Sequence, residues 1–201
     1  MHIHLRLLSA RSSFFASKFL RSWRCSASSV YIARTDLPRR FLRRYALWLY
    51  GSSEYATFDP SLTAPKLLLE LSDLHIAASI VGDESFANDV THAMILHLVR
   101  RSNEIPLPEL QTNAKGSTGR KLMADWVVWS MEVPDVELKK NLEEVQDADF
   151  GYAVAKAMLR KTCKEWEGDL LPPYIASPCL YHTHLQLGSV GCSVARDETK
   201  S

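Results

Sequence analysis

The chain has 201 residues, of which 46% are hydrophobic, and its formal net charge is +1. These values suit a single domain with a hydrophobic core. The four cysteines are scattered without a CxxC pair, which excludes a disulfide scaffold and favours a reducing compartment. No apolar run approaches the roughly 18–20 residues that a membrane span needs, so none is predicted.

Charge is distributed unevenly along the chain. Up to Arg44 there are ten basic residues and one acidic residue, whereas the remainder has fourteen basic and twenty-two acidic residues. The two parts therefore differ in electrostatic character. The acidic remainder argues against broad binding to nucleic acid.

The N-terminal segment is rich in Arg and Ser and has no acidic residue before Asp36, which is the composition of a mitochondrial transit peptide. We expect residues 1–36 to form a disordered basic tail. Import into mitochondria is the alternative interpretation of the same composition. The sequence does not otherwise determine the compartment, and the cytoplasm or nucleus is favoured.

A short basic helix is predicted over residues 39–50. Phe41, Tyr45 and Trp48 share one helical face, whereas four arginines gather on another, and Gly51 ends the helix. We expect the aromatic face to enter the core and the arginine face to lie in solvent. The alternative is that the arginines bind an anionic partner such as nucleic acid or acidic lipid.

Two amphipathic helices joined by a tight turn are predicted over residues 67–98. The apolar stripe of the first helix consists of Leu67, Leu71, Leu74, Ala78 and Val81, and that of the second consists of Phe86, Val90, Ala93, Met94, His97 and Leu98. Gly82 can adopt the left-handed conformation that ends a helix, and Asp83 can cap the next helix. Because two such stripes are unfavourable in water, this hairpin requires a partner surface.

Three more helices are predicted toward the C-terminus: residues 120–131, residues 135–145, and a last helix that begins at Asp147 or Asp149 and ends near Trp166. The expected core stripe of the last helix is Tyr152, Ala155, Leu159, Cys163 and Trp166, and Phe150, Val154, Ala157 and Met158 broaden its apolar surface. From Tyr174 onward we expect irregular structure.

These elements predict a mainly α domain over residues 37–187, in which five or six short helices surround the hairpin. A disordered tail is expected over residues 188–201. The predicted core includes Leu49, Leu71, Leu74, Ala78, Phe86, Val90, Trp126, Leu159 and Trp166.

The best candidate for a metal site is the cluster of Cys179, His182 and His184. One thiolate and two imidazoles suit zinc, with Cys192 or Cys163 as a fourth ligand. The alternative is that Cys179 packs as a small hydrophobic residue and the histidines bond the backbone. A Cys/His nucleophile pair would need a third, orienting group that the sequence does not supply, so no catalytic residue is nominated.

Three segments together resemble a known family. Residues 41–56, with Trp48 to Gly51, resemble the helix of BTB/POZ domains that carries a WLY motif, and residues 67–95 resemble the helical hairpin that follows it. Residues 119–129 and 179–184 are similar to the C-terminal extension of fungal BTB proteins. The order of these segments identifies the chain with the C-terminal helical part of that family.

The resemblance implies a non-enzymatic protein–protein interaction module. The family's N-terminal α/β half, which mediates dimerisation and much of the cullin-ligase contact, has no counterpart in residues 1–40, so those two functions are not carried over. A missing half would leave the apolar face of the hairpin bare, and we therefore expect Leu71, Leu74, Phe86 and Val90 to contact an unidentified protein partner. A small zinc-binding protein and a mitochondrially imported protein are the alternatives.

Overall fold

The computed structural model describes residues 5–22, 37–59, 61–100, 117–130, 147–167 and 171–182. Within these ranges the chain has eight α-helices, two 3₁₀ helices and no strand, which confirms a mainly α fold. The elements are α1 Leu5–Arg11, α2 Ser13–Ser22, α3 Arg39–Leu49, η1 Ser53–Ala56, α4 Ala64–Val81, α5 Glu84–Arg100, α7 Ser117–Ser130, α9 Ala148–Glu167, α10 Pro173–Ala176 and η3 Pro178–Tyr181. The helix predicted over residues 135–145 lies outside the described residues.

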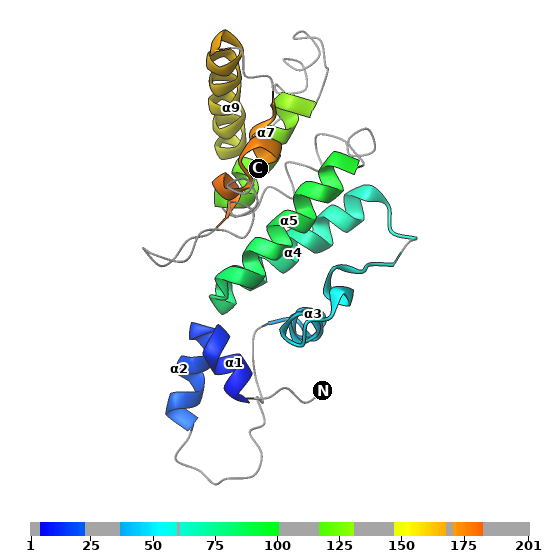
Figure 1. The fold of residues 1–201 in the computed structure, drawn as a ribbon, viewed down its shortest axis with the longest axis vertical. Coiled ribbons are helices and arrows are strands. Elements are labelled where there is room, and N and C mark those ends of the chain that lie inside the picture. Colours follow the sequence, from blue (N-terminus) through cyan, green and yellow to red (C-terminus); the bar gives the residue numbers. More distant parts are fainter. Residues whose placement is uncertain are drawn as a thin grey trace, which may run out of the picture.

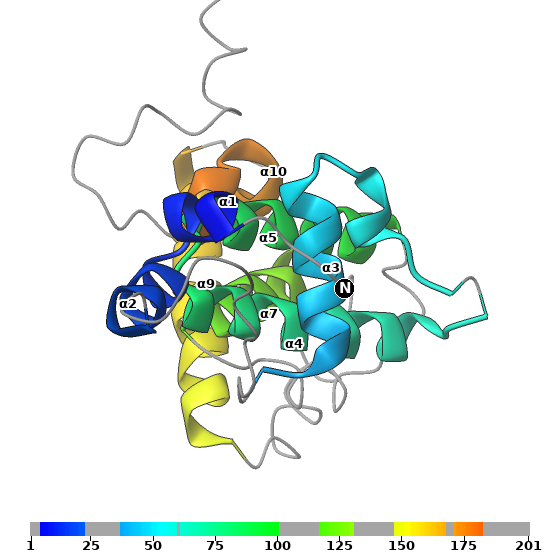
Figure 2. The same ribbon diagram turned by 90° about the horizontal axis from the view of Figure 1, so that it is seen from below.

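The helical hairpin of α4 and α5 lies at the centre of the fold (Figure 1). Helices α1, α2 and α3 cover one side of it, and α7, α9 and α10 lie on the other, with α2 in contact with α4 and α5 in contact with α7 and η3. Figure 2, which views the fold from below, shows α3 crossing the hairpin and α1 and α2 beside it. The partner surface that the hairpin requires is thus supplied by the chain itself.

The turn of the hairpin confirms the sequence prediction. Gly82 has a φ of +67°, in the left-handed region, and ends α4. The Asp83 carboxylate accepts a hydrogen bond from the backbone N–H of Phe86 at 3.1 Å, which caps α5. Local sequence therefore determines this turn, because the glycine and the capping acid act within a few residues of each other.

The prediction of a disordered tail over residues 1–36 is wrong for residues 5–22, which form α1 and α2 and enter the core. Leu8 and Phe15 are buried, and the Phe15 ring stacks on Tyr45 with 6.2 Å between centroids. The Ser12 hydroxyl donates to the carbonyl of Val81 at 2.6 Å and accepts from the N–H of Phe15 at 3.2 Å. The buried side chains of Leu8 and Phe15 and the hydrogen bonds of Ser12 attach this segment to the core, although its composition is typical of a disordered tail.

The start of α2 lies close to this glycine. A Cβ atom built on Gly82 would lie 2.5 Å from the Ser13 hydroxyl oxygen and 3.8 Å from Ser13 Cβ, so rotation of that hydroxyl would relieve the contact. The start of α2 therefore packs directly against the α4–α5 turn.

Helix α3 packs on the hairpin through an aromatic cluster. Phe41 and Tyr45 are buried, and Phe86 of α5 contacts the rings of Phe41, Tyr45 and Trp48 at centroid distances of 5.0–6.0 Å. Each such pair contributes roughly 0.5–1.5 kcal/mol beyond its buried area. The predicted aromatic face is thus the face that enters the core, and Leu49 packs partly buried at its edge.

Helix α9 enters the core through a different face from the predicted one. Phe150, Val154 and Ala157 are buried, whereas Tyr152 is 72% exposed and Leu159 is 69% exposed. The expected core position of Leu159 is therefore wrong, and the side chain of Trp166 lies outside the described residues. The helix begins as expected, since the Asp147 carboxylate accepts hydrogen bonds from the N–H groups of Asp149 and Phe150.

The other C-terminal elements agree partly with the sequence analysis. On α7, Leu122, Met123, Trp126 and Val127 are buried, which confirms the predicted core position of Trp126. Irregular structure was expected from Tyr174 onward, but the described residues there, up to residue 182, belong to α10 and η3. Two prolines at the starts of these short helices set the backbone angle there, and Tyr181 is buried at the end of η3.

Replacement of Phe15 tests whether the N-terminal helices belong to the core. Phe15→Ala should lower the free energy of unfolding by about 3–5 kcal/mol, because it removes a fully buried ring. The neighbouring Phe14 is only partly buried, so Phe14→Ala is a matched control with a smaller loss. Urea denaturation measures both values, and equal losses would contradict the packing of α2 described above.

Candidate functional site

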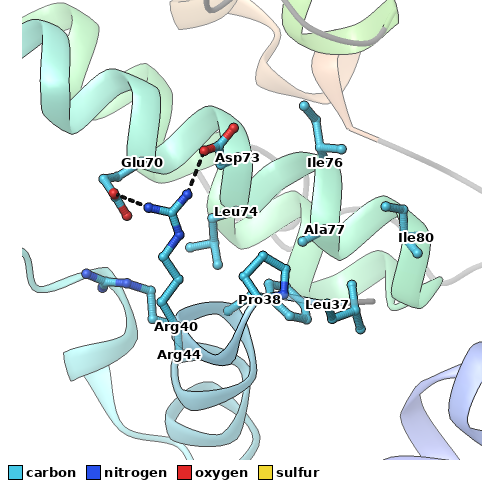
Figure 3. Close-up of a pocket in the computed structure, with 11 residues that line it drawn as sticks. Leu37, Pro38, Arg40, Arg44, Glu70, Asp73, Leu74, Ile76, Ala77 and Ile80 are labelled. Carbon is cyan, nitrogen blue, oxygen red and sulfur yellow. Dashed lines mark hydrogen bonds and ion pairs between the residues drawn. The ribbon is translucent and has the colours of Figure 1, made fainter. Parts of the chain in front are cut away.

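A groove lies between α3 and α4 (Figure 3). Its volume is about 250 Å³, and its apolar lining consists of Leu37, Pro38, Phe41, Leu74, Ile76, Ala77 and Ile80. Small-molecule sites usually occupy roughly 300–1,000 Å³. The groove is therefore better sized for one or two side chains than for a cofactor.

One end of the groove is bordered by a charged cluster. The Arg40 guanidinium donates to Glu70 at 2.7 Å and to Asp73 at 2.9 Å, and Figure 3 shows it between the two carboxylates. Glu70 and Asp73 lie three residues apart on α4 and so face the same side. Because the Arg40 side chain is 55% exposed, each pair contributes no more than about 1 kcal/mol. The cluster mainly sets the position of α3 along α4.

A second arginine is held in the wall of the groove. The Arg44 guanidinium donates to the carbonyls of Tyr55 at 2.7 Å and Thr57 at 3.0 Å, and it lies 3.8 Å from the centroid of the Phe58 ring. Burial lowers the pKa of Arg44, although an arginine stays charged at any physiological pH. Two of the four arginines expected to face solvent are therefore engaged within the chain.

The position of α3 also depends on a buried hydrogen bond to the hairpin turn. The Tyr45 hydroxyl donates to the second carboxylate oxygen of Asp83 at 2.8 Å. Burial and the nearby Asp83 charge raise the pKa of Tyr45 above its usual range. Burial also raises the pKa of Asp83, and this effect exceeds the opposing effect of the hydrogen bonds from Phe86 and Tyr45.

The four residues predicted to contact a partner are all in the core. Leu71, Leu74, Phe86 and Val90 are at most 4% exposed. They belong to the hydrophobic core that also contains Phe15, Tyr45 and Trp126. Helices from both parts of the chain already cover the hairpin, so the expectation that Leu71, Phe86 and Val90 contact a partner directly is wrong, whereas Leu74 also lines the groove between α3 and α4.

A second apolar surface lies on the outer face of α9. Tyr152, Ala155, Leu159 and Cys163 are exposed there at spacings of three and four residues, so they share one face. The apolar spacing predicts this stripe, but the expected core position of the stripe is wrong for these four residues. Its exposure makes it a candidate contact surface for another molecule.

The orientation of α9 is set by polar contacts to α7. Arg160 donates to one carboxylate oxygen of the buried Asp125, and the Tyr181 hydroxyl donates to the other at 2.7 Å. Lys161 donates to the carbonyl of Val128 at 3.1 Å. Burial and the hydrogen bond to Asp125 raise the pKa of Tyr181 above its usual range.

Asp125 was not identified from the sequence. The one signal that could have found it was an acid inside the apolar run of α7, next to Trp126. Such a position requires a partner, since an unpaired buried charge costs several kcal/mol. Both oxygens of Asp125 are bonded within the chain, which favours a structural role.

The predicted zinc cluster falls only partly within the described residues. Cys179 lies in η3 and His182 follows it, whereas His184 and Cys192 lie outside the described residues. Cys163 is on the exposed face of α9. In the part of the chain that the structure describes, no three His, Cys, Asp or Glu side chains are placed to hold a metal ion. Zinc binding stays a prediction.

Comparisons with known proteins give no family for this chain. No family model, no curated protein and no solved structure matches it. The resemblance to BTB proteins therefore rests on the three sequence segments alone. None of the described helices has the length and apolarity to cross a bilayer.

The raised pKa of Asp83 predicts a dependence of stability on pH. The unfolded chain loses this proton near the ordinary carboxyl pKa of 3.8, whereas the folded protein keeps it to a higher pH. Protonation of Asp83 therefore stabilises the folded protein fully below pH 3.8, and this stabilisation is lost as the pH rises through the pKa of Asp83 in the folded state. Asp83→Asn cannot titrate, so the stability of the wild type relative to this variant should fall as the pH rises from about 4. A relative stability that increases with pH, measured by urea denaturation, would contradict the prediction.

Removal of the buried Asp125 carboxylate should weaken the packing of α9 on α7 and lower the free energy of unfolding. Asp125→Ala leaves Arg160 without its carboxylate partner. Because the Arg160 side chain is about one-third exposed, the free energy of unfolding should fall by about 2–4 kcal/mol, less than is usual when one partner of a fully buried ion pair is removed. Tyr181→Phe removes one hydrogen bond only and should cost about 1 kcal/mol. Thermal and urea denaturation compare the two variants, and equal effects would argue against a structural role for the Arg160 contact.

Proposed function

We propose that this chain is a non-catalytic protein–protein interaction module. The observation that carries the proposal is the apolar groove between α3 and α4 (Figure 3), at whose edge Ile80 is 55% exposed. The resemblance to the helical part of fungal BTB proteins supports the same function. The partner is expected to contact the groove, and not the buried hairpin stripes.

The charges around the groove indicate the kind of partner. Arg40 and Arg44 are balanced by Glu70 and Asp73, so the groove has no excess of either sign. Recognition therefore depends on apolar contact, which suits one or two aliphatic or aromatic side chains of a partner segment. Binding of an anion such as nucleic acid is disfavoured, because Arg40 is paired with two carboxylates and Arg44 is bonded to backbone carbonyls.

The chemistry of the lining residues argues against catalysis in the groove. None of the described lining residues is Ser, Thr, Cys, His, Lys or Tyr, so the groove offers no nucleophile other than the two carboxylates. Both carboxylates bond Arg40, which lies between them. Ion pairs of this kind orient helices and do not need the shifted pKa values of an acid–base pair.

Selection of peptides tests the groove even though its natural partner is unidentified. Peptides selected from a random phage-displayed library on the wild type should be rich in apolar residues. Ile80→Arg should weaken their binding by at least about tenfold, which corresponds to about 1.4 kcal/mol. Ile175 of α10 is 50% exposed, and Ile175→Arg is the matched control, which should bind like the wild type.

Fluorescence anisotropy measures these affinities, and circular dichroism checks that both variants keep the wild-type fold. Equal binding by the two variants would place the peptide elsewhere on the molecule. Failure to enrich any peptide above an unrelated immobilised protein would contradict the proposed function of the groove.

A further inference from the structure

Helices α1 and α2, over residues 5–22, form a basic unit beside the hairpin (Figure 2), which we call the N-terminal helix pair. The sequence of the pair has no acidic residue, and neither has any of residues 1–35. Its basic residues are Arg6, Arg11, Lys18 and Arg21. Residues 23–38 separate the pair from α3, which is enough chain for the pair to leave the hairpin while α3 stays in place.

The N-terminal helix pair is amphipathic in its docked position. Leu8 and Phe15 are buried in the core, whereas Arg6 and Arg11 are exposed to solvent. A helix with aromatic and aliphatic residues on one side and basic residues on the other is typical of segments that lie at a membrane surface. In the folded chain the apolar side of the pair is covered by protein.

The pair is held at the hairpin turn and on α3. The Ser12 hydroxyl donates to the Val81 carbonyl at 2.6 Å, and the Phe15 ring stacks on Tyr45. Helices of seven and ten residues are not stable alone in water, so α1 and α2 lose their structure together when these contacts open. Short segments held by a small number of buried side chains are those that open locally before the whole protein unfolds.

The acidic groups at the turn are engaged with the hairpin and α3. Asp83 is bonded to Tyr45 and to the backbone of Phe86, Asp89 accepts from the indole N–H of Trp48, and Glu84 lies in the first turn of α5. Burial raises the pKa of Asp83, and the nearby charge of Arg11 opposes this effect. Arg11 also lies 5.7 Å from the Trp48 ring centroid. Undocking separates Arg11 from these groups, because all of them stay with the hairpin and α3.

We propose that the N-terminal helix pair is a releasable element that binds an anionic membrane surface when it leaves the hairpin. The rings of Phe14 and Phe15 then enter the headgroup boundary, and the basic residues of the pair face the lipid phosphates. Docking and membrane binding use the same apolar side, so the two states exclude each other. The proposal concerns residues separate from the α3–α4 groove and does not depend on the function proposed for it.

An acidic protein or a nucleic acid is the competing partner for a released basic segment. Either one would use the cations and would have no need of the apolar side. The sequence of α2 places Phe14, Phe15, Phe19 and Leu20 among its basic residues, and a membrane interface accommodates both kinds of side chain. The combination favours the membrane surface.

A disulfide between α2 and the hairpin turn tests the release. A Cβ atom built on Gly82 would lie 3.8 Å from Ser13 Cβ, within the range of about 3.5–4.5 Å that a disulfide requires. The variant Ser13→Cys/Gly82→Cys is made in the full chain with its four native cysteines replaced by alanine. Because Gly82 has a positive φ, a cysteine there is strained, but the strain is present in both the oxidised and the reduced form.

Co-sedimentation with vesicles of phosphatidylcholine and phosphatidylglycerol measures the binding. The reduced form should bind at least about tenfold more tightly than the oxidised form, in which the pair is locked on the hairpin. Vesicles of phosphatidylcholine alone should bind neither form. Added salt should weaken the binding of the reduced form.

Single substitutions separate docking from membrane contact. Ser12→Ala removes the hydrogen bonds that dock the pair and should raise the affinity for anionic vesicles at least about threefold, because it populates the released state. Ser17→Ala is the matched control, since Ser17 is exposed and bonds only the carbonyl of Phe14 within α2, and it should bind like the wild type. Phe14 is only partly buried, so Phe14→Ala should weaken vesicle binding without releasing the pair.

Several outcomes would overturn the proposal. Equal binding by the oxidised and reduced forms would show that release of the pair plays no part, and no binding of the reduced form to anionic vesicles would exclude the membrane surface. Binding of the reduced form to polyglutamate or to a DNA oligonucleotide as tightly as to vesicles, and unchanged by Phe14→Ala, would identify a polyanion as the partner. Circular dichroism checks that each variant keeps the wild-type fold, and the redox comparison needs no second variant if Ser12→Ala does not fold.

Discussion

The buried carboxylate of Asp83 joins the hairpin to the helices that precede it. One of its oxygens accepts from the backbone of Phe86 and the other from the Tyr45 hydroxyl, so the charge is satisfied at a position almost without solvent. The Val81 carbonyl, two residues earlier, accepts the Ser12 hydroxyl. Helices α2, α3, α4 and α5 therefore meet at one turn. The shape of the α3–α4 groove depends on this junction, because it holds α3 in place.

A second buried carboxylate has the corresponding role in the C-terminal part. Asp125 bonds Arg160 of α9 and Tyr181 of η3, and it thereby fixes two elements on α7. Since both faces of α9 are apolar, hydrophobic burial alone discriminates poorly between them. The contacts of Arg160 and Lys161 with α7 select the face that enters the core. A polar constraint thus determines which apolar residues of α9 stay exposed.

The groove between α3 and α4 is apolar and electrostatically balanced, so shape and hydrophobic contact determine what binds there. The outer face of α9 carries exposed apolar residues with both Lys156 and Asp149 beside them, so its charge favours no particular partner. The hairpin stripes that suggested an interaction role provide the core on which both surfaces are built.

Much of the secondary structure was determined by the sequence itself. The spacing of apolar residues located α3, α4, α5, α7 and α9, and the Gly82–Asp83 turn and the start at Asp147 followed from capping chemistry that acts over a few residues. The sequence predicted less of the candidate sites. Its apolar spacing gave the stripe of α9 but not the exposure of that stripe, and nothing in it indicated the groove between α3 and α4. Tertiary structure alone decided that residues 5–22 join the core, that Asp125 pairs with Arg160, and that Tyr152 and Leu159 face outward. The physical reason is distance along the chain: Ser12 bonds a carbonyl 69 positions away, and Arg160 bonds an acid 35 positions away, so no local pattern reports either contact.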